Sequence, residues 1–384
     1  MVRWPRQIMF GDVDAMFASA AIVANPSLAG KLVAVGNPPP RGIITAASYA
    51  ARRHGVAAAM PTAHALRLCP DLTLVPPDRP LYQRLHERMR TVTDRFFPTT
   101  EWTSIDEFYA ESTDLQSIYP DPLVLARGVK EAIVEMTGLR CTLAVATGKT
   151  VAKVAADCHK PDGLVVISPG TEAAFLAPQP VGAIPGIGPK TSAELDRIGI
   201  HSIGDLLDAR FEPMLRRRWG SRLLALQSLA RGVDTDAVVR NRDHKSLGHE
   251  STFDQDTDDV RCLERTVRSF LSDLSHDLRM EGLAARAFVV KLKDSQFKVT
   301  TRQRRFSRPL NYDPAMWPEI RAALRSLTVL GTRYRLVGLS FSGLCPATAD
   351  LYEQRSSRAV AAMDTIIERH GSRIMRLGET PREN

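Results

Sequence analysis

The chain has 384 residues, of which 44% are hydrophobic and 24% are charged. These values are typical of a globular protein and exclude collagen-like repeats, wholesale disorder and a membrane-embedded helix bundle. Lys and Arg number 51 against 43 Asp and Glu, so the net charge of +8 is compatible with a polyanionic partner without requiring one. The 5 Cys are widely spaced with no CxxC pair, which favours reduced thiols in a cytoplasmic protein.

The first 170 residues alternate strand-like and helix-like runs. Asp12 and Asp14 interrupt the first apolar run, so we expect no signal peptide and a soluble, cytoplasmic chain without a membrane span. The pattern predicts strands over 8–14, 32–36, 42–46 and 139–146, a hairpin over 101–110, and helices over 15–24, 81–96, 122–137 and 149–158. Such a mixed α/β order predicts a sheet covered by helices.

The pattern changes near residue 178. Short helical segments separated by glycines continue to about residue 233, and a polar stretch over 234–243 reads as a linker. Beyond it, strands over 245–253, 284–293, 297–306 and 334–341 and helices over 260–280 and 317–327 predict a βαββαβ sandwich. The tail holds one amphipathic helix pattern over 358–370.

Basic residues gather in the last predicted sheet. Lys298, Thr300, Arg302 and Arg304 alternate along one strand, so their side chains share one face. A solvated face is one interpretation. Clustered like charges repel unless something anionic meets them, and we therefore favour contact with a phosphate backbone.

Two acidic motifs carry the chemistry. Asp12 and Asp14 are two apart at the end of the first strand, where Asp14 suits a solvated or helix-capping role and Asp12, after an apolar run, does not. Asp106 and Glu107 are adjacent carboxylates in an otherwise apolar hairpin and are costly to bury without a cation. Asp12, Asp106 and Glu107 together could hold two divalent metals, and hard oxygen donors select Mg²⁺.

These motifs resemble those of the Y-family DNA polymerases, the translesion enzymes, and most closely the bacterial DinB branch. The resemblance rests on collinear motifs across residues 7–343: DxDxxFA at 12–18, YAARRHGV at 49–56, SIDE at 104–107, KTVAKVAADCHKPDG at 149–163, PGIGPKT at 185–191 and KSLGHESTF at 245–253. It implies an α/β (α+β) multidomain right-hand polymerase fold. The implied domains are a palm (1–30 and 76–170), fingers (31–75), a helix–hairpin–helix thumb (171–233), a linker (234–244), a βαββαβ little finger (245–345) and a tail (346–384).

The resemblance also implies residue roles. Asp12, Asp106 and Glu107, with the carbonyl of Val13, would ligate two Mg²⁺ ions. A second group would contact the incoming dNTP: Phe17 as the steric gate against a 2′-OH, with Thr45, Tyr49, Arg52 and Lys160 at the triphosphate. A third group would contact primer-template DNA: Gly186, Gly188 and Lys190 in the thumb, and Lys298, Arg302 and Arg304 in the little finger.

Several positions depart from the family pattern. Gly11 stands at a site that is usually apolar and branched, and Ala21 stands where an acid is common. Thr45 and Ala46 replace the common Ser-Thr pair, so Ala46 lacks a hydroxyl that often bonds the triphosphate. Phe108 is larger than the small residue usual after the acidic pair. These departures bear on efficiency rather than on the class of reaction.

The tail contains Leu351 and Tyr352 in a segment similar to the peptide by which bacterial polymerases bind the sliding clamp, although its leading Gln is missing. An apolar anchor in a linker is an equal alternative.

We expect a monomeric, low-fidelity translesion polymerase that uses dNTPs, primer-template DNA and two Mg²⁺. The alternatives are a non-catalytic DNA- and clamp-binding scaffold, which would be expected to lose the acids, and a two-metal nuclease or cyclase, which would leave the thumb motif unexplained.

Overall fold

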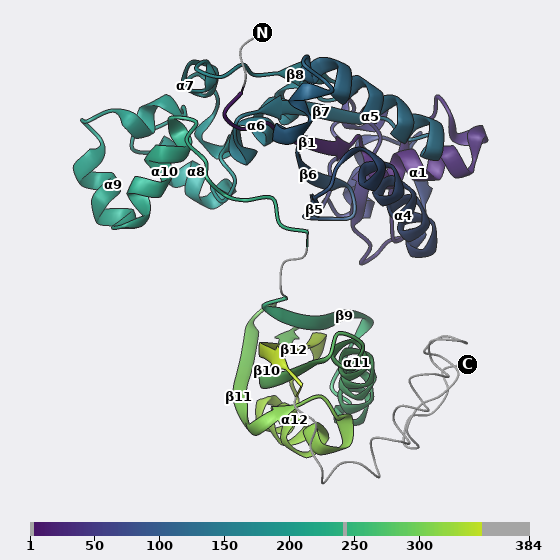
Figure 1. The fold of residues 1–384 in the computed structure, drawn as a ribbon. Helices are drawn as coiled ribbons and strands as arrows, with labels where there is room; N and C mark the ends of the chain where they lie inside the picture. The colour runs from purple at the N-terminus through teal and green to yellow at the C-terminus, as the bar shows by residue number, and fades with distance from the viewer. Residues whose placement is uncertain (1–3, 241–243, 348–384) are drawn as a thin grey trace. The chain divides into compact units, whose positions relative to one another are not determined.

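The structure is a computed structural model that describes residues 4–240 and 244–347. The chain divides into two compact units, Met1–Arg242 and Asp243–Asn384, which we call unit 1 and unit 2 (Figure 1). Across these described ranges, no helix combines the length and the apolar character needed to cross a bilayer.

Unit 1 is built on a five-stranded sheet in the order β5-β6-β1-β7-β8. The strands are β1 (Ile8–Val13), β5 (Thr100–Trp102), β6 (Glu107–Glu111), β7 (Cys141–Ala146) and β8 (Leu164–Val166). Every residue of the central strand β1 is buried, as the apolar run in the sequence predicts. The predicted strand at 139–146 and the hairpin at 101–110 are confirmed, whereas the three-residue β8 was too short to predict.

Helices cover both faces of this sheet. Met9 and Val13 of β1 face α4 (Arg79–Phe96) and α5 (Pro122–Thr137), whereas Ile8 and Phe10 face α6 (Lys149–His159). This division follows from the two-residue period of a strand. Both α4 and α5 begin at an Asp whose carboxylate accepts a backbone N–H, followed by a Pro near the first turn, and α5 ends at Gly138 in the left-handed conformation.

A smaller sheet in the order β3-β2-β4 packs beside α1 (Met16–Ala24). Its strands are β2 (Val33–Gly36), β3 (Ile44–Ala47) and β4 (Thr73–Val75), joined by the short helices α2 (Tyr49–Arg52) and α3 (Thr62–Leu68). The sequence predicted β2 and β3 but not β4, α2 or α3. In the contact between α1 and β2, α1 contributes the small residues Ala18 and Ala21, and β2 contributes Val33 and Val35.

The rest of unit 1 is helical. It contains α7 (Glu172–Leu176), α8 (Pro189–Asp196), α9 (Glu212–Trp219) and α10 (Arg222–Ala230), with 3-10 turns at Val181–Ala183 and Gly204–Leu207. Its apolar residues share one hydrophobic core with the inner face of α6. The prediction of short helices without strands over this region is confirmed for these elements.

Residues 234–240, which the sequence analysis assigned to a linker, are attached to unit 1 by charged contacts. The carboxylate of Asp234 accepts hydrogen bonds from the backbone N and Oγ1 of Thr150, both 2.8 Å long. Nζ of Lys149 lies 2.6 Å from the buried Glu101 Oε2 and 3.0 Å from Asp236 Oδ2. The first part of the segment is therefore bound to the N-terminus of α6 and the adjacent strand β5.

Unit 2 has the predicted βαββαβ order: β9 (Ser246–Thr257), α11 (Val260–Met280), β10 (Leu283–Asp294), β11 (Val299–Leu310), α12 (Asp313–Leu327) and β12 (Tyr334–Pro346). The sheet order is β11-β10-β12-β9, with α11 and α12 on one face (Figure 1). The core between them includes Phe288, Phe306 and Phe341. β11 is an edge strand, and all of its residues from Val299 to Arg305 are exposed.

Candidate active site

The register of β1 and β6 brings the predicted acids together. Asp12 is the direct cross-strand partner of Glu107, and the backbone N of Val13 donates a 3.0 Å hydrogen bond to the carbonyl of Asp106. Side chains of cross-strand partners lie on the same face of a sheet. Asp12 is only 6% exposed, because β1 is the central strand. The acids thus meet at one end of β1.

The turn between β5 and β6 holds Asp106 in place. The hydroxyl of Ser104 donates to Asp106 Oδ1 at 2.6 Å and accepts the backbone N–H of Glu107 at 3.1 Å. Beneath the turn, Nδ1 of His86 lies 3.0 Å from the carbonyl oxygen of Ile105. This short turn therefore has a defined conformation, which orients the Asp106 carboxylate.

Two lysines, one in α6 and one in the following loop, form ion pairs with Asp12 and Glu107. Lys160 Nζ lies 2.5 Å from Asp12 Oδ2 and 2.9 Å from Asp157 Oδ1, and Lys153 Nζ lies 2.7 Å from Glu107 Oε1. Burial raises the pKa of Asp12 to about 7, against the lowering effect of Lys160. Burial by itself would lower the pKa of Lys160, but Asp12 and Asp157 outweigh it and raise that pKa.

The same acids have the donor chemistry of a hard-cation site. In the part of the chain that the structure describes, no group of three or more His, Cys, Asp or Glu side chains is already arranged around a common ion position. The carboxylates of Asp12 and Glu107 are instead paired with lysine ammonium groups, which supply the positive charge that these carboxylates require. Carboxylate oxygens are the ligands that Mg²⁺ prefers, so the residues fit a divalent metal that would replace the lysine contacts.

A pocket of about 220 Å³ lies between the acids and the smaller sheet. The predicted site residues that line it are Asp12, Val13, Phe17, Thr45, Tyr49, Arg52, Asp106 and Lys160. The guanidinium of Arg52 stacks 4.6 Å from the centre of the Tyr49 ring, and its Nε donates to the carbonyl of Ala47 at 3.0 Å. Segments that are distant in the sequence therefore contribute an acidic wall and a basic, aromatic wall to one pocket.

Phe17 is half-buried on α1. The centroid of its ring lies 4.4 Å from the centroid of the Tyr82 ring. Tyr82 itself is 4% exposed and belongs to α4, so the support under Phe17 is rigid. One side of the Phe17 ring is packed against this support while the residue also lines the pocket.

The predicted DNA-contacting residues lie in both units. Gly186 has a φ of +94°. Gly188 directly precedes α8, which begins at Pro189. Lys190 lies in the first turn of α8 and is exposed. In unit 2, the register places Arg302 opposite Val290 and Arg304 opposite Phe288.

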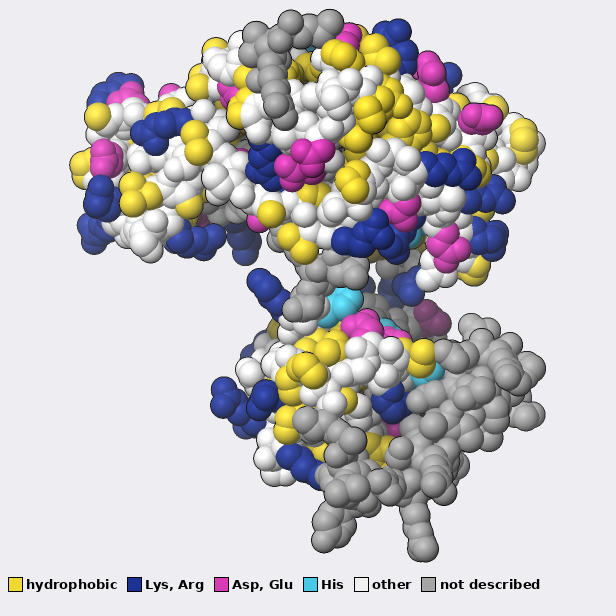
Figure 2. All heavy atoms as spheres, viewed as in Figure 1, with side chains coloured by type: hydrophobic (Ala, Val, Ile, Leu, Met, Phe, Trp, Pro, Cys, Tyr) yellow, Lys and Arg dark blue, Asp and Glu magenta, His cyan; other side chains and the backbone are white. Residues whose placement is uncertain are grey.

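Val290 and Phe288 belong to the core beneath the helices, so Arg302 and Arg304 lie on the helix-covered side of the sheet. They remain exposed because β11 is the edge strand. Side chains of Lys and Arg gather at this edge of unit 2 (Figure 2). On the open face, Arg305 and Gln303 pair with Ala287 and Val289. Leu351 and Tyr352 lie outside the described residues.

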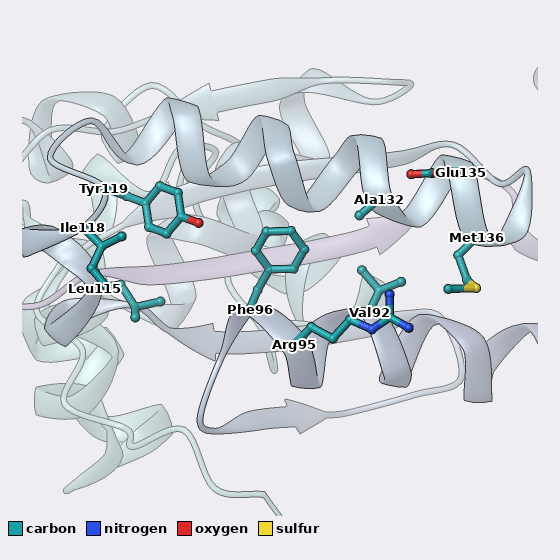
Figure 3. A pocket seen from close by; sticks show the side chains of 9 residues that line it. All are labelled: Val92, Arg95, Phe96, Leu115, Ile118, Tyr119, Ala132, Glu135 and Met136. Carbon is teal, nitrogen blue, oxygen red and sulfur yellow. The ribbon is translucent and has the colours of Figure 1, made fainter.

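A larger pocket of about 670 Å³ lies elsewhere in unit 1. Its lining consists of Val92, Arg95, Phe96, Leu115, Ile118, Tyr119, Ala132, Glu135 and Met136. Phe96 of α4 projects toward α5 at its centre (Figure 3). None of the predicted site residues in the described ranges contributes to this mostly apolar pocket, and its side chains offer no cluster of acids or bases for chemistry.

One buried carboxylate beside the site was not predicted from the sequence. Asp14 was assigned a solvated or capping role, but it is only 4% exposed, and α1 begins after Ala15 without any side-chain cap. Its carboxylate accepts hydrogen bonds from Thr142 Oγ1 at 3.0 Å and from the backbone N of Asp162 at 2.7 Å. The even spacing from Ile8 and Phe10, which face α6, was the available signal.

Comparisons with known proteins agree with this arrangement. The impB/mucB/samB family profile matches residues 11–157, its C-terminal domain profile matches residues 244–356, and the helix–hairpin–helix profile of the same family matches residues 169–200. A relative named DNA polymerase IV from Methanoculleus marisnigri is 36% identical over 360 residues, which cover 92% of this chain and 99% of the relative.

Two solved structures of Y-family polymerases are similar to this chain in fold. A Y-family DNA polymerase chimera of Dbh and Dpo4 superposes with a TM-score of 0.81 at 25% identity, covering 89% of this chain and 100% of the chimera. A post-insertion binary complex of Dbh DNA polymerase superposes with a TM-score of 0.64 at 26% identity, with the same coverage of 89% and 100%.

Proposed function

The chain belongs to the impB/mucB/samB family of Y-family DNA polymerases, and we propose that Asp12, Asp106 and Glu107 form its catalytic centre. It is a DNA-directed DNA polymerase of the DinB type, which performs translesion synthesis. It has the fold of a multidomain right-hand polymerase. The alternative of a non-catalytic scaffold is not favoured, because all three acids are present beside the pocket.

Members of this family depend on a divalent metal, and the finer proposal is that two Mg²⁺ ions bind here. Asp12, Asp106 and Glu107 would hold them, with the carbonyl of Val13 assisting. When bound, such ions stabilise the charge that develops at the α-phosphate and activate the primer 3′-OH. Glu107 would lie nearest the primer terminus. The pairing of Lys153 with Glu107 and of Lys160 with Asp12 supports this assignment, because each carboxylate already engages a cation.

The pocket beside the acids would take the dNTP. Arg52 would hold the triphosphate through its planar guanidinium and Lys160 as a point charge, with Tyr49 and Thr45 completing the contacts. Lys160 bridges the two walls of the site, since it lines the pocket and pairs with Asp12. Phe17 would lie under the sugar and exclude a 2′-OH, and its packing against Tyr82 supports a rigid gate.

We further propose that the predicted domains have their family roles: palm for 1–30 and 76–170, fingers for 31–75, thumb for 171–233 and little finger for 245–345. The polymerase binds primer-template DNA and dNTPs. Gly186, Gly188 and Lys190 would meet a backbone phosphate at the N-terminus of α8. Arg302 and Arg304 would reach phosphates from the exposed edge strand β11, and Lys298 would do so from the position just before that strand begins. We propose that the protein acts as a monomer. We also propose that Leu351 and Tyr352 bind the sliding clamp.

The observation that carries the catalytic assignment is the register of Asp12 opposite Glu107, with Val13 bonded to Asp106. It is tested by primer extension with Mg²⁺ on an undamaged template. Asp106→Asn should reduce the rate of extension by about a hundredfold to a thousandfold, since an electrostatic contact of this kind lowers the barrier by about 3–4 kcal/mol, while DNA binding persists. Glu111→Gln, at the far end of the strand β6 that follows Asp106, is the matched control. Normal extension by Asp106→Asn would refute the metal assignment.

A further inference from the structure

Asp14 connects two parts of the site that are separate in the sequence. Its Oδ2 accepts the backbone N–H of Asp162 at 2.7 Å, and its Oδ1 accepts Thr142 Oγ1 at 3.0 Å and the Tyr49 hydroxyl at 3.4 Å. These donors come from the loop after α6, from β7 and from α2. A buried carboxylate is costly unless such donors compensate for its lost hydration.

The loop that Asp14 contacts carries Lys160. Lys130 Nζ donates to the carbonyls of Asp162 and Gly163 at 2.6 and 3.0 Å, and Arg140 forms an ion pair with the Asp162 side chain. Thr142 Oγ1 also accepts the backbone N–H of Gly163 at 3.2 Å. The backbone on the C-terminal side of Lys160 is therefore held from several directions, and Asp14 supplies the buried carboxylate among these groups.

The other contact of Asp14 is with Tyr49 at the start of α2. Tyr49 in turn stacks with Arg52. One carboxylate thus touches both the element that presents Tyr49 and Arg52 and the loop that presents Lys160. Asp14 itself is not among the residues that line the pocket between them. It can act on a bound nucleotide only through these neighbours.

From this geometry we infer that Asp14 is a positioning residue for the nucleotide: it holds the Lys160 loop and Tyr49 in the relative placement that binds a dNTP triphosphate. The inference rests on the proposed function, since that proposal assigns Tyr49, Arg52 and Lys160 to the triphosphate. Its consequence is specific. Loss of the Asp14 carboxylate should weaken the affinity for dNTP and leave the chemical step largely intact.

The test is Asp14→Asn in the full-length protein. An Asn keeps the shape but loses the charge and one acceptor oxygen. With its carbonyl toward the Asp162 N–H, its amide group would face the Thr142 and Tyr49 hydroxyls, which could no longer donate to it and would have to reorient as acceptors. In single-nucleotide insertion on a primer-template with Mg²⁺, we expect the apparent Kd for dNTP to rise about tenfold, equivalent to about 1.4 kcal/mol. The maximal insertion rate and the DNA affinity should stay close to wild type. Asp71→Asn, an exposed change of the same kind, is the control.

A second measurement is independent of activity. Hydrogen exchange of the Asp162 and Gly163 amides, in protein without metal or nucleotide, should be faster in Asp14→Asn than in wild type, because their acceptor network is broken. Thr142→Val, which removes the hydroxyl shared by Asp14 and Gly163, should shift both readouts in the same direction. It provides the test if Asp14→Asn does not fold.

The outcomes separate this inference from the proposed function. Lys160→Ala should weaken dNTP binding, and Asp14→Asn should add little to it if Asp14 acts through Lys160. An unchanged dNTP affinity in Asp14→Asn together with a weakened one in Lys160→Ala would overturn the inference alone, as would a slower insertion step at unchanged affinity. An unchanged affinity in Lys160→Ala would instead remove the triphosphate assignment, and the exchange experiment would still decide whether Asp14 holds the loop.

Discussion

Gly11 and Phe108 are direct cross-strand partners in β1 and β6, and the ring of Phe108 fills the space that a side chain at position 11 would need. A Cβ added to Gly11 would lie 2.3 Å from Phe108 Cε1 and 2.7 Å from Leu143 Cδ2. The motif comparison predicts that position 11 is smaller and position 108 larger than is usual in the family. In the structure the small residue and the large ring complement each other directly beneath Asp12 and Glu107.

This pair predicts a non-additive double-mutant cycle. Gly11→Val should destabilise unit 1 by about 1–3 kcal/mol through overpacking, and Phe108→Ala by about 3–5 kcal/mol through a cavity. The double variant should be more stable than the sum of the two changes predicts, because the valine would fill part of the cavity. Urea unfolding of the four proteins measures this. Strict additivity would show that the two positions do not compensate.

Phe17→Ala should weaken discrimination between deoxyribonucleotides and ribonucleotides. The Phe17 ring lines the pocket and rests on Tyr82, so its removal opens space at the proposed position of the sugar. We expect ribonucleotide insertion relative to dNTP insertion to rise by at least about tenfold, the lower end of what one apolar group contributes to selectivity. Val23→Ala, at an exposed position of the same helix, should leave the ratio unchanged. If Phe17→Ala left it unchanged as well, Phe17 would not be the gate.

Lys149 should be important for the attachment of residues 234–240. Its ammonium lies 2.6 Å from Glu101 Oε2, and the two side chains are 7% and 2% exposed. Lys149→Met would remove the cation that lies against the buried Glu101 carboxylate and should cost about 3–5 kcal/mol of stability. Thermal unfolding measures the loss of stability, and limited proteolysis within residues 234–240 measures their detachment.

The matched comparison is the double variant Lys149→Met/Glu101→Gln, which removes both charges. It should recover part of the lost stability, since the buried Glu101 charge is then removed together with that of Lys149. Lys31→Met, at an exposed lysine, serves as the control. Equal stability of Lys149→Met and wild type would show that the ion pair contributes nothing to the attachment.

Glu264 should make the stability of unit 2 depend on pH. Its carboxylate lies 3.1 Å from Arg321 Nε and 2.6 Å from Arg325 Nε. Burial acts to raise the pKa of Glu264, but hydrogen bonds from these two guanidinium groups outweigh it and lower the pKa below 4.5. A lowered carboxyl pKa stabilises the fold above pH 4.5, and this contribution disappears as the pH falls through the lower, folded-state value.

Glu264→Gln should therefore have a lower free energy of unfolding than wild type at pH 7. The expected difference is only about 1 kcal/mol, because both arginines are partly solvated. In acid the two proteins should be equally stable. Hydrogen exchange of amides in α11 and α12 measures the stability of unit 2 within the full-length protein. A constant difference between the two proteins from pH 7 to pH 3 would contradict this prediction.

The sequence predicted the secondary elements of both units where their patterns are long. The buried run at Ile8–Val13 and the amphipathic pattern of α11 are examples, and both elements have the expected type. Short elements such as β4 and β8, with three residues each, carry too little periodicity to be predicted. Their strands form because neighbouring strands offer hydrogen-bonding edges, which is a tertiary effect.

Within the site, local motifs identified the residue types but not their neighbours. The spacing in DxDxxFA and SIDE indicated Asp12 and the Asp106–Glu107 pair as candidates, and strand alternation indicated that Arg302 and Arg304 share a face. The alternation could not say which face, because that depends on which side of β10 packs under the helices. For the same reason the polar composition of residues 234–240 did not reveal their attachment to Lys149 and Thr150.

The sequence by itself determined the chemistry that this chain can carry, because carboxylates, lysines and an aromatic ring are properties of single residues and of spacings within one element. Only the tertiary structure decided how these groups combine. Asp14 became a shared acceptor for Thr142, Tyr49 and Asp162, and Phe108 became the complement of Gly11, through strand register and helix packing between distant segments. Such contacts depend on the three-dimensional path of the whole backbone, and no local pattern encodes them.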